Sequence, residues 1–226
     1  MADSFSLAHA FTEKWEGGLS HHPADPGGLT NHGISLRWVQ DLVRQARQEC
    51  LRQRRSCDGC SGAQAARCPS RTLDMDMDGD VDADDIRACT KKQAAALFRA
   101  HFWDKTACAA LPLPLAIVLY DGAVNMGAPR SVRHMQQAMN MIGEAHLDHF
   151  VAIAEDGRMG PRSIELARAL AAVNLDWLTA RAALRLRRAF YRSLAARRPD
   201  LKVFLAGWLN RANALENHLA RQEREN

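Results

Sequence analysis

Apolar side chains recur every three or four residues along most of the chain, which is the spacing of an amphipathic α-helix. In the first such segment, Phe5, Ala8, Phe11 and Trp15 share one face, and the pattern ends at Gly17. Strand-like alternation is almost absent, so we expect a mainly α-helical fold whose only sheet is a small hairpin region between residues 19 and 35. The pattern predicts helices over residues 3–16, from 35 onwards, and over 83–101, 115–124, 129–142, 164–173, 175–194 and 201–223.

The helical pattern fails between Cys50 and Thr72, where Gly, Ser, Cys and Pro dominate. We interpret this stretch as part of an insertion. All six cysteines lie between Cys50 and Cys108, so we expect them to serve this one region. Disulfide bonds are the favoured interpretation. A zinc site and free thiols are the alternatives, although a four-ligand zinc site usually has a second close cysteine pair besides the single C-x2-C.

Charge and hydropathy exclude some classes of protein. The chain has 226 residues and a formal net charge of +4, which suits an anionic polymer such as nucleic acid or cell wall as a partner. Its longest apolar run is far shorter than the ~20 residues that cross a bilayer. The first residues lack the basic head and apolar stretch of a signal peptide. We therefore expect neither a membrane span nor a signal peptide.

The stretch DMDMDGDVDADD, residues 74–85, has the register of a calcium-binding loop. Such a loop needs oxygen ligands at positions 1, 3, 5, 7, 9 and 12 and a glycine at position 6. Gly79 stands at position 6, position 12 is Asp rather than Glu, and no clear helix precedes the loop, as in the dockerin-type half of an EF-hand. The alternative is a solvated acidic run. We expect one structural Ca²⁺, held by Asp74, Asp76, Asp78, Asp80 (through its carbonyl oxygen), Asp82 and Asp85.

Three polar residues near the N-terminus form a candidate catalytic set. Cleavage of a glycosidic bond needs a general acid in a partly apolar setting and a second polar group that holds water. Glu16 closes the first predicted helix beside Trp15, and Asp25 and Thr30 follow in the next loop. By spacing alone, Glu16 could equally be a solvated surface residue and Asp25 a turn residue.

The stretch EGGLSHHPADPGGLTNHGIS resembles the opening signature of the glycoside hydrolase family 108 muramidases. The segments YDGAVNMGAPRSVRHMQQAMN, EDGRMGPRSIELARAL and FLAGWLNRANAL are similar to the peptidoglycan-binding region of the same proteins, so the resemblance covers residues 5–40 and about 90–220. It implies a lysozyme-like helical fold in which Glu16 is the catalytic acid. Asp25 and Thr30 would position water, although their separation is one residue shorter than in phage-type lysozymes.

The same resemblance implies an N-acetylmuramidase of the endolysin type that cleaves the bond between N-acetylmuramic acid and N-acetylglucosamine, without a catalytic metal. We expect Tyr120 and Asn125 to bind the saccharide, with capping of helix and turn ends as the alternative. Peptidoglycan rather than nucleic acid is the expected partner of a monomeric protein. The predicted parts are residues 1–44 of a catalytic domain, an insertion at 45–88 and a helical remainder at 89–226. Synthesis in the cytoplasm and release by a holin or a secretion system would bring it to the periplasm or the outside. The alternative is a non-catalytic, calcium-responsive wall-binding module on the same scaffold.

Overall fold

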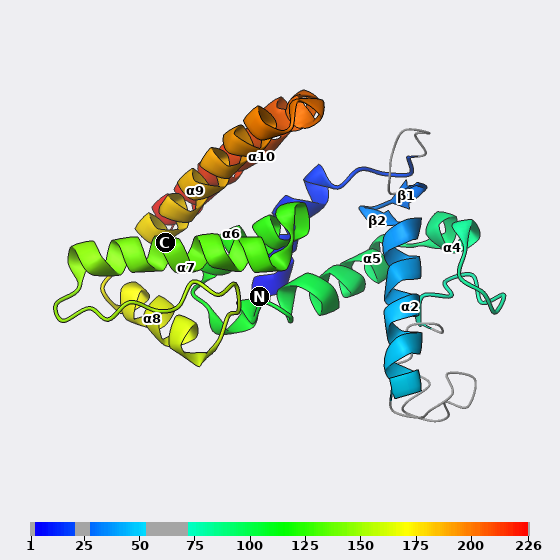
Figure 1. The fold of residues 1–226 in the computed structure, drawn as a ribbon, viewed down its shortest axis with the longest axis horizontal. Helices are drawn as coiled ribbons and strands as arrows, with labels where there is room; N and C mark the ends of the chain where they lie inside the picture. The colour runs from blue at the N-terminus through cyan, green and yellow to red at the C-terminus, as the bar shows by residue number, and fades with distance from the viewer. Residues whose placement is uncertain (1–2, 21–27, 53–71, 226) are drawn as a thin grey trace. The chain divides into compact units, whose positions relative to one another are not determined.

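The computed structural model describes residues 3–20, 28–52 and 72–225. The chain forms two compact units, one made of Met1–Thr12 with Phe98–Asn226 and the other of Glu13–Leu97. Helices dominate the described residues of both units, and the sheet there is a single two-stranded hairpin (Figure 1). The expected mainly α-helical class is therefore confirmed.

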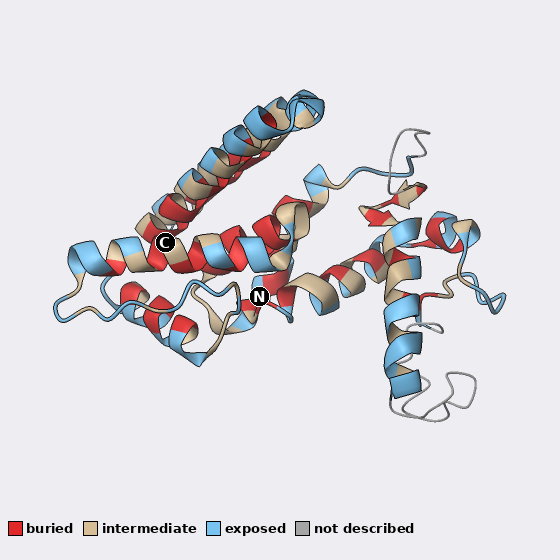
Figure 2. Cartoon of the chain, viewed as in Figure 1, coloured by how far each residue is buried: buried red, intermediate tan, exposed pale blue. Residues whose placement is uncertain are grey.

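The first unit is built around α6 (Leu113–Met126), which is buried at every position from Pro114 to Ala123 (Figure 2). A helix that is apolar on all sides must be surrounded by protein, and α6 contacts α1, α7 and α9. The unit also contains α1 (Ser4–Thr12), the π-helical turn η4 (Arg99–Trp103), the 3-10 turns η5 (Cys108–Ala110) and η6 (Pro199–Phe204), α7 (Ala128–His146), α8 (Pro161–Ala172), α9 (Asp176–Arg197) and α10 (Leu205–Glu225).

A fully buried carboxylate, that of Asp121 on α6, connects four helices of this unit. It accepts hydrogen bonds from Thr12 Oγ1 at the end of α1 (3.1 Å), Arg187 Nη1 on α9 (2.6 Å) and Arg211 Nη2 on α10 (2.7 Å). Burial opposes the charged form, but the two guanidinium groups outweigh it and hold the pKa of the Asp121 carboxyl below its ordinary value. Asp121 is therefore charged and paired inside the core.

The second unit contains the hairpin, in which β1 (Thr30–Asn31) pairs with β2 (Ile34–Ser35) in antiparallel register. His32 and Gly33 connect the strands with positive φ angles of 49° and 77°. Two such residues are what a tight type I′ hairpin turn requires. The predicted sheet between residues 19 and 35 is thus confirmed. The other elements are η1 (Glu13–Trp15), α2 (Leu36–Arg52), α4 (Ala83–Ala88) and α5 (Lys91–Phe98), whose last residue belongs to the first unit.

Two predicted helices are shorter or more divided than the apolar pattern suggested. The α-helix expected over residues 3–16 ends at Thr12 and continues as a 3-10 turn. The helix expected over 83–101 breaks at Cys89, because Thr90 begins a new helix as its cap. Thr90 Oγ1 accepts from Gln93 N (3.2 Å) and Thr90 N donates to the Gln93 side chain (2.9 Å), which is a capping box.

The helix predicted over residues 129–142 is longer than expected. The sequence pattern predicts that Gly143 closes the helix that begins near Pro129, yet α7 runs on to His146. Gly143 instead allows a close contact, since a Cβ atom there would overlap the ring of Phe150. A glycine inside a helix costs about 0.5–1 kcal/mol relative to alanine. The close packing of Phe150, in the loop that follows, explains why a glycine stands at this position in the helix.

We predict that Asp121→Asn destabilises the protein strongly. The substitution removes the carboxylate that pairs with the buried Arg187 and Arg211, and breaking a buried ion pair costs about 3–5 kcal/mol. Urea unfolding followed by circular dichroism measures this loss. Asp200→Asn is the matched control, because Asp200 forms an exposed pair with Arg198, whose loss costs about 1 kcal/mol or less. Equal losses for the two variants would contradict the central role of Asp121.

Candidate active site

Glu16 lies in the second unit, directly after the 3-10 turn η1 and before Gly17 and Gly18. Its amide donates to Glu13 O (3.3 Å), so the turn fixes the backbone from which the Glu16 side chain projects. The residue is half-buried, whereas the preceding Trp15 is exposed. Glu13, one turn earlier, forms an ion pair with Lys91 (3.1 Å). Both carboxylates are half-buried, the partly enclosed setting that suits a general acid, and the ion pair with Lys91 engages that of Glu13.

Glu16 and Thr30 lie in the same unit, and the segment that follows Glu16 pairs with the strand that begins at Thr30. Ser20 and Thr30 form a β-bridge, with Ser20 N to Thr30 O at 2.8 Å and Thr30 N to Ser20 O at 2.9 Å. The segment that leaves Glu16 is thus hydrogen-bonded to β1 four residues later. Thr30 is half-buried. Asp25, the third member of the predicted set, lies outside the described residues.

Asn31 was missed by the sequence reasoning, although it stands beside Thr30 in the same signature. It is buried, and its side-chain Nδ2 donates to the carbonyl oxygens of Ile86 (3.0 Å) and Cys89 (3.3 Å) at the end of α4. The side-chain amide of Asn can do this while the Asn31 backbone pairs in the hairpin.

Tyr120 and Asn125, the predicted saccharide-binding residues, lie on α6 in the first unit. Tyr120 has no exposed surface, and its hydroxyl is 2.8 Å from His9 Nδ1, which argues against direct contact with a sugar. Asn125 is half-buried at the end of α6. The Tyr191 hydroxyl accepts a bond from Arg187 Nε (2.6 Å), so its one proton is left for Asn125 Oδ1. The amide nitrogen of Asn125 therefore faces away from Tyr191.

The acidic stretch predicted to bind calcium forms a compact loop before α4. Its six predicted ligand residues fall into two groups of three, Asp74, Asp76 and Asp78, and Asp80, Asp82 and Asp85, each with carboxylate oxygens within 4.8 Å of one another. Gly79 has a φ of +103°, which fits the sharp turn expected at position 6.

Asp85 closes this loop at its far end. Its carboxylate is fully buried and accepts from the backbone of Met75, Asp76 and Asp82, which joins the first residues of the loop to the last. Asp74 Oδ1 is buried without a hydrogen-bond partner among the described residues. Burial and the neighbouring carboxylates raise the pKa of Asp76, and repulsion from Asp78 raises the pKa of Asp80. Crowded, partly unpaired oxygens are the donor set that a hard cation prefers.

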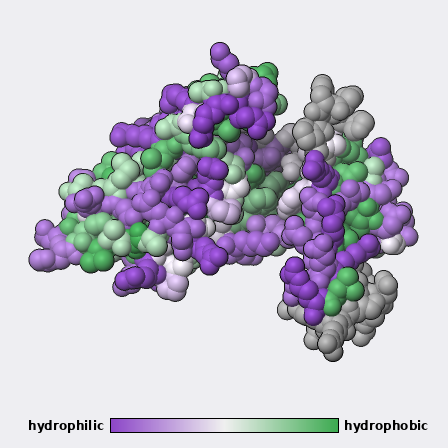
Figure 3. Space-filling model, viewed as in Figure 1, coloured by the Kyte–Doolittle hydropathy of each residue, from purple (hydrophilic) through white to green (hydrophobic). Residues whose placement is uncertain are grey.

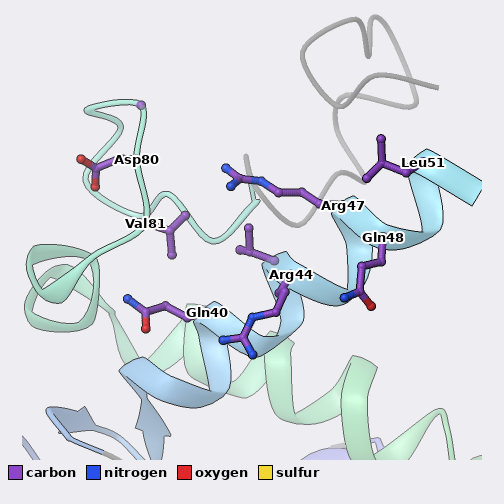
Figure 4. Close-up of a pocket in the computed structure, with 9 residues that line it drawn as sticks. Gln40, Arg44, Arg47, Gln48, Leu51, Asp80 and Val81 are labelled. Atoms are coloured by element: carbon purple, nitrogen blue, oxygen red, sulfur yellow. The ribbon is translucent and has the colours of Figure 1, made fainter. Parts of the chain in front are cut away.

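A groove of about 510 Å³ separates this loop from α2. Figure 4 shows Arg47 extending from α2 towards the loop that carries Asp80 and Val81. Gln40 and Arg44 line the same side, and Arg44 also pairs with Asp41 (3.0 Å). The surface along α2 is largely hydrophilic (Figure 3). The acidic loop therefore faces basic side chains within its own unit.

The cysteines among the described residues do not form the expected disulfide bonds. Cys50, Cys89 and Cys108 have free thiols, while Cys57, Cys60 and Cys68 lie outside the described residues. Cys108 is buried in the first unit against Thr106 Oγ1 (3.1 Å), and burial raises the pKa of its thiol to about 12. Burial also raises the pKa of Cys89. These two residues act as small buried apolar groups, so the expectation of disulfides is wrong for them.

A helical scaffold in which a Glu-bearing turn is followed by a short hairpin defines the class of lysozyme-like proteins. The profile of the Glycosyl hydrolase 108 family matches residues 9–127, just over half of the chain, and that of the Predicted Peptidoglycan domain matches residues 130–213. The chain therefore belongs to the glycosyl hydrolase 108 family, and the two matches together support a role as a peptidoglycan hydrolase.

A solved structure, described as the structure of Brucella abortus SagA, is similar in fold. It has a TM-score of 0.63 and 22% sequence identity, and the similarity covers 96% of this chain and 94% of that chain. At this identity the similarity concerns the fold alone. No curated protein matches the chain. None of the helices in the described ranges has the length and hydropathy that a membrane span requires.

We predict that Cys108 resists iodoacetamide in the native protein at pH 8 and reacts fully once the protein is unfolded without reductant. The thiolate is the reacting form, and the raised pKa and burial suppress it in the folded state. Mass spectrometry of tryptic peptides measures the modification at each cysteine, with the less buried Cys50 as the comparison. A Cys108 peptide that stays unmodified after unfolding, and is released only by reductant, would show a disulfide instead.

Proposed function

We propose that the protein is an N-acetylmuramidase that cleaves peptidoglycan between N-acetylmuramic acid and N-acetylglucosamine. The family membership supports glycoside hydrolysis, and the second family match supports peptidoglycan as the substrate. The observation that carries the proposal is the placement of Glu16. It is half-buried directly after a hydrogen-bonded turn, and four residues later Ser20 pairs with Thr30 of the hairpin.

Glu16 protonates the oxygen of the leaving sugar, and Thr30, with Asp25, holds the attacking water. A water molecule needs at least two polar partners to be positioned, and Thr30 offers its hydroxyl from the first position of β1. That hydroxyl lies 3.4 Å from Gly28 O, a long contact that leaves it free to bind water more strongly.

Asn125 is proposed to contact the saccharide. Its oxygen is engaged by Tyr191, so the amide nitrogen is the group available to donate a hydrogen bond to an acetamido carbonyl or a sugar hydroxyl. We do not extend this role to Tyr120, because it is fully buried.

The proposal includes a structural Ca²⁺ in the loop at residues 74–85. The unpartnered Asp74 Oδ1 and the two carboxylate groups support a fit of oxygen donors to this cation. Asp74, Asp76, Asp78, Asp82 and Asp85 would supply carboxylate oxygens and Asp80 its carbonyl oxygen. The ion would neutralise the repulsion among these side chains and so stabilise the start of α4, without taking part in hydrolysis.

We also propose that the protein is released from the cytoplasm through a holin or a dedicated secretion system and acts on the wall from the periplasm or outside. The support is chemical, because a peptidoglycan hydrolase must reach the wall.

The first test is Glu16→Gln, which keeps the shape of the side chain and removes the proton donor. We expect wall hydrolysis to fall by about 10² to 10⁴, the usual contribution of general acid catalysis. Glu13→Gln is the matched control, because it lies one turn earlier and pairs with Lys91, and it should retain activity. Mass spectrometry of the released muropeptides identifies the cleaved bond through a new reducing-end muramic acid. Full activity of the Glu16→Gln variant would refute the mechanism, and a non-catalytic wall-binding module would release no muropeptides at all.

The second test concerns calcium. Calcium at 100 times its Kd should stabilise the protein by about 2.7 kcal/mol if it binds only the folded form, and chelation should lower Tm. Calorimetric titration of the chelated protein with CaCl₂ measures binding directly. Asp78→Ala should abolish it, whereas Asp84→Ala should not, since Asp84 lies outside the ligand register and pairs with Arg87. No heat of binding at millimolar calcium, or an unchanged melting curve, would contradict the proposed site.

A further inference from the structure

The loop that connects α7 to α8, residues 147–160, is held in one conformation by a stripe of side chains on α7. Arg133, Gln136, Asn140 and Gly143 recur at intervals of three and four, so they share one face of the helix. Asn140 makes two hydrogen bonds to Ile153, with Nδ2 donating to the carbonyl (2.9 Å) and Oδ1 accepting from the amide (3.0 Å).

Gln136 and Arg133 continue this attachment. Gln136 Nε2 donates to Asp156 Oδ1 and Arg158 O, both at 2.9 Å, and Gln136 Oε1 accepts from Gly157 N at 2.9 Å. Arg133 Nε donates to the carbonyl of Glu155 (3.0 Å). A long connection without regular structure is uncommon in a compact domain and usually has a function. Here it is also rigid, which is what a preorganised binding site requires.

A groove of about 380 Å³ lies between this loop and α8. Its apolar part includes the half-buried Phe150, which packs on Gly143, and Leu166, which is buried. Its polar part comes from both sides, with His149 on the loop in the left-handed region (φ +53°) and Arg162 on α8. Asp148 and Glu165 complete the charged lining.

The charges on the α8 side of this groove are unpaired within the described ranges of the chain. Arg162 and Glu165 stand one turn apart on α8, and neither takes part in an ion pair among those residues. The lining therefore offers one guanidinium and two carboxylates around an apolar surface. A ligand that matches it carries carboxylate and ammonium groups close together, separated by small apolar groups.

We propose that this groove binds the peptide stem of peptidoglycan, which deepens the proposed function and rests on it for the identity of the polymer. The stem carries free carboxylates, the ammonium group of its diamino acid and the methyl groups of its alanines. Arg162 pairs with a stem carboxylate, Glu165 and Asp148 pair with the ammonium group, and Phe150 and Leu166 contact the methyl groups. The glycan strand does not match, because its hydroxyl and acetamido groups are uncharged.

The test is calorimetric titration of the full-length protein with a synthetic stem peptide, L-Ala, D-isoglutamate, diaminopimelate and D-Ala. We expect saturable binding that weakens roughly tenfold or more in Arg162→Gln and in Glu165→Gln, the loss of one charge-assisted hydrogen bond. Arg197→Gln, an exposed arginine on α9, removes the same charge outside the groove and should bind as the unmodified protein does. Unchanged melting curves show that each variant is folded.

Modified peptides assign each contact. A peptide with amidated carboxylates should have the same affinity for Arg162→Gln as for the unmodified protein. A peptide whose diaminopimelate amine is acetylated should have the same affinity for Glu165→Gln as for the unmodified protein. The proposal is overturned if the stem peptide does not bind at millimolar concentration, if Arg162→Gln binds like Arg197→Gln, or if a peptide-free glycan oligomer binds in its place. The titration contains no glycosidic bond, so its outcome is independent of the result for Glu16→Gln.

Discussion

The first unit depends on one buried charge. The carboxylate of Asp121 receives donors from α1, α9 and α10 while its own helix, α6, forms the centre of the core. Desolvating three ionic groups is costly, and their attraction offsets that cost only when all are present in good geometry. The orientation of these helices is therefore set by a polar interaction with narrow geometric tolerance, in addition to apolar contacts. Arg187 extends the network to Tyr191 and then to Asn125.

The two family matches do not correspond to two separable domains. The match to the Glycosyl hydrolase 108 family ends at residue 127 and so includes α6, while the match to the Predicted Peptidoglycan domain begins at residue 130 and includes α7 and α9. Yet α6, α7 and α9 all pack against one another in one core. The two matched regions thus share a hydrophobic core, and a substitution in one region can change the stability of the other.

Local signals predicted most helices, and long-range interactions account for what the sequence could not reveal. The apolar period predicted α2, and a high density of Gly, Pro, Asn, Asp and His predicted a loop or short irregular hairpin between residues 19 and 35. Asp121 could be recognised as a polar residue in an apolar helix, but its partners Arg187 and Arg211 lie 66 and 90 residues away. A glycine such as Gly143 usually marks a helix end. The contact with Phe150 shows that this glycine is required for packing inside α7 instead. The candidate acid Glu16 came from a motif, whereas the burial of Tyr120 could not be inferred from that motif.

The side chain of Asn31 also determines how independent the acidic loop and α4 are of the rest of their unit. Inserted segments are usually expected to be removable, because they enter and leave the fold at its surface. Here the acceptors for the buried Asn31 amide are carbonyl oxygens at the end of α4, directly downstream of the acidic loop. A chain shortened between α2 and α5 would leave that amide buried and unsatisfied beneath the hairpin. The acidic segment is therefore part of the architecture of its unit, because the helix that follows it satisfies a buried side chain of the hairpin.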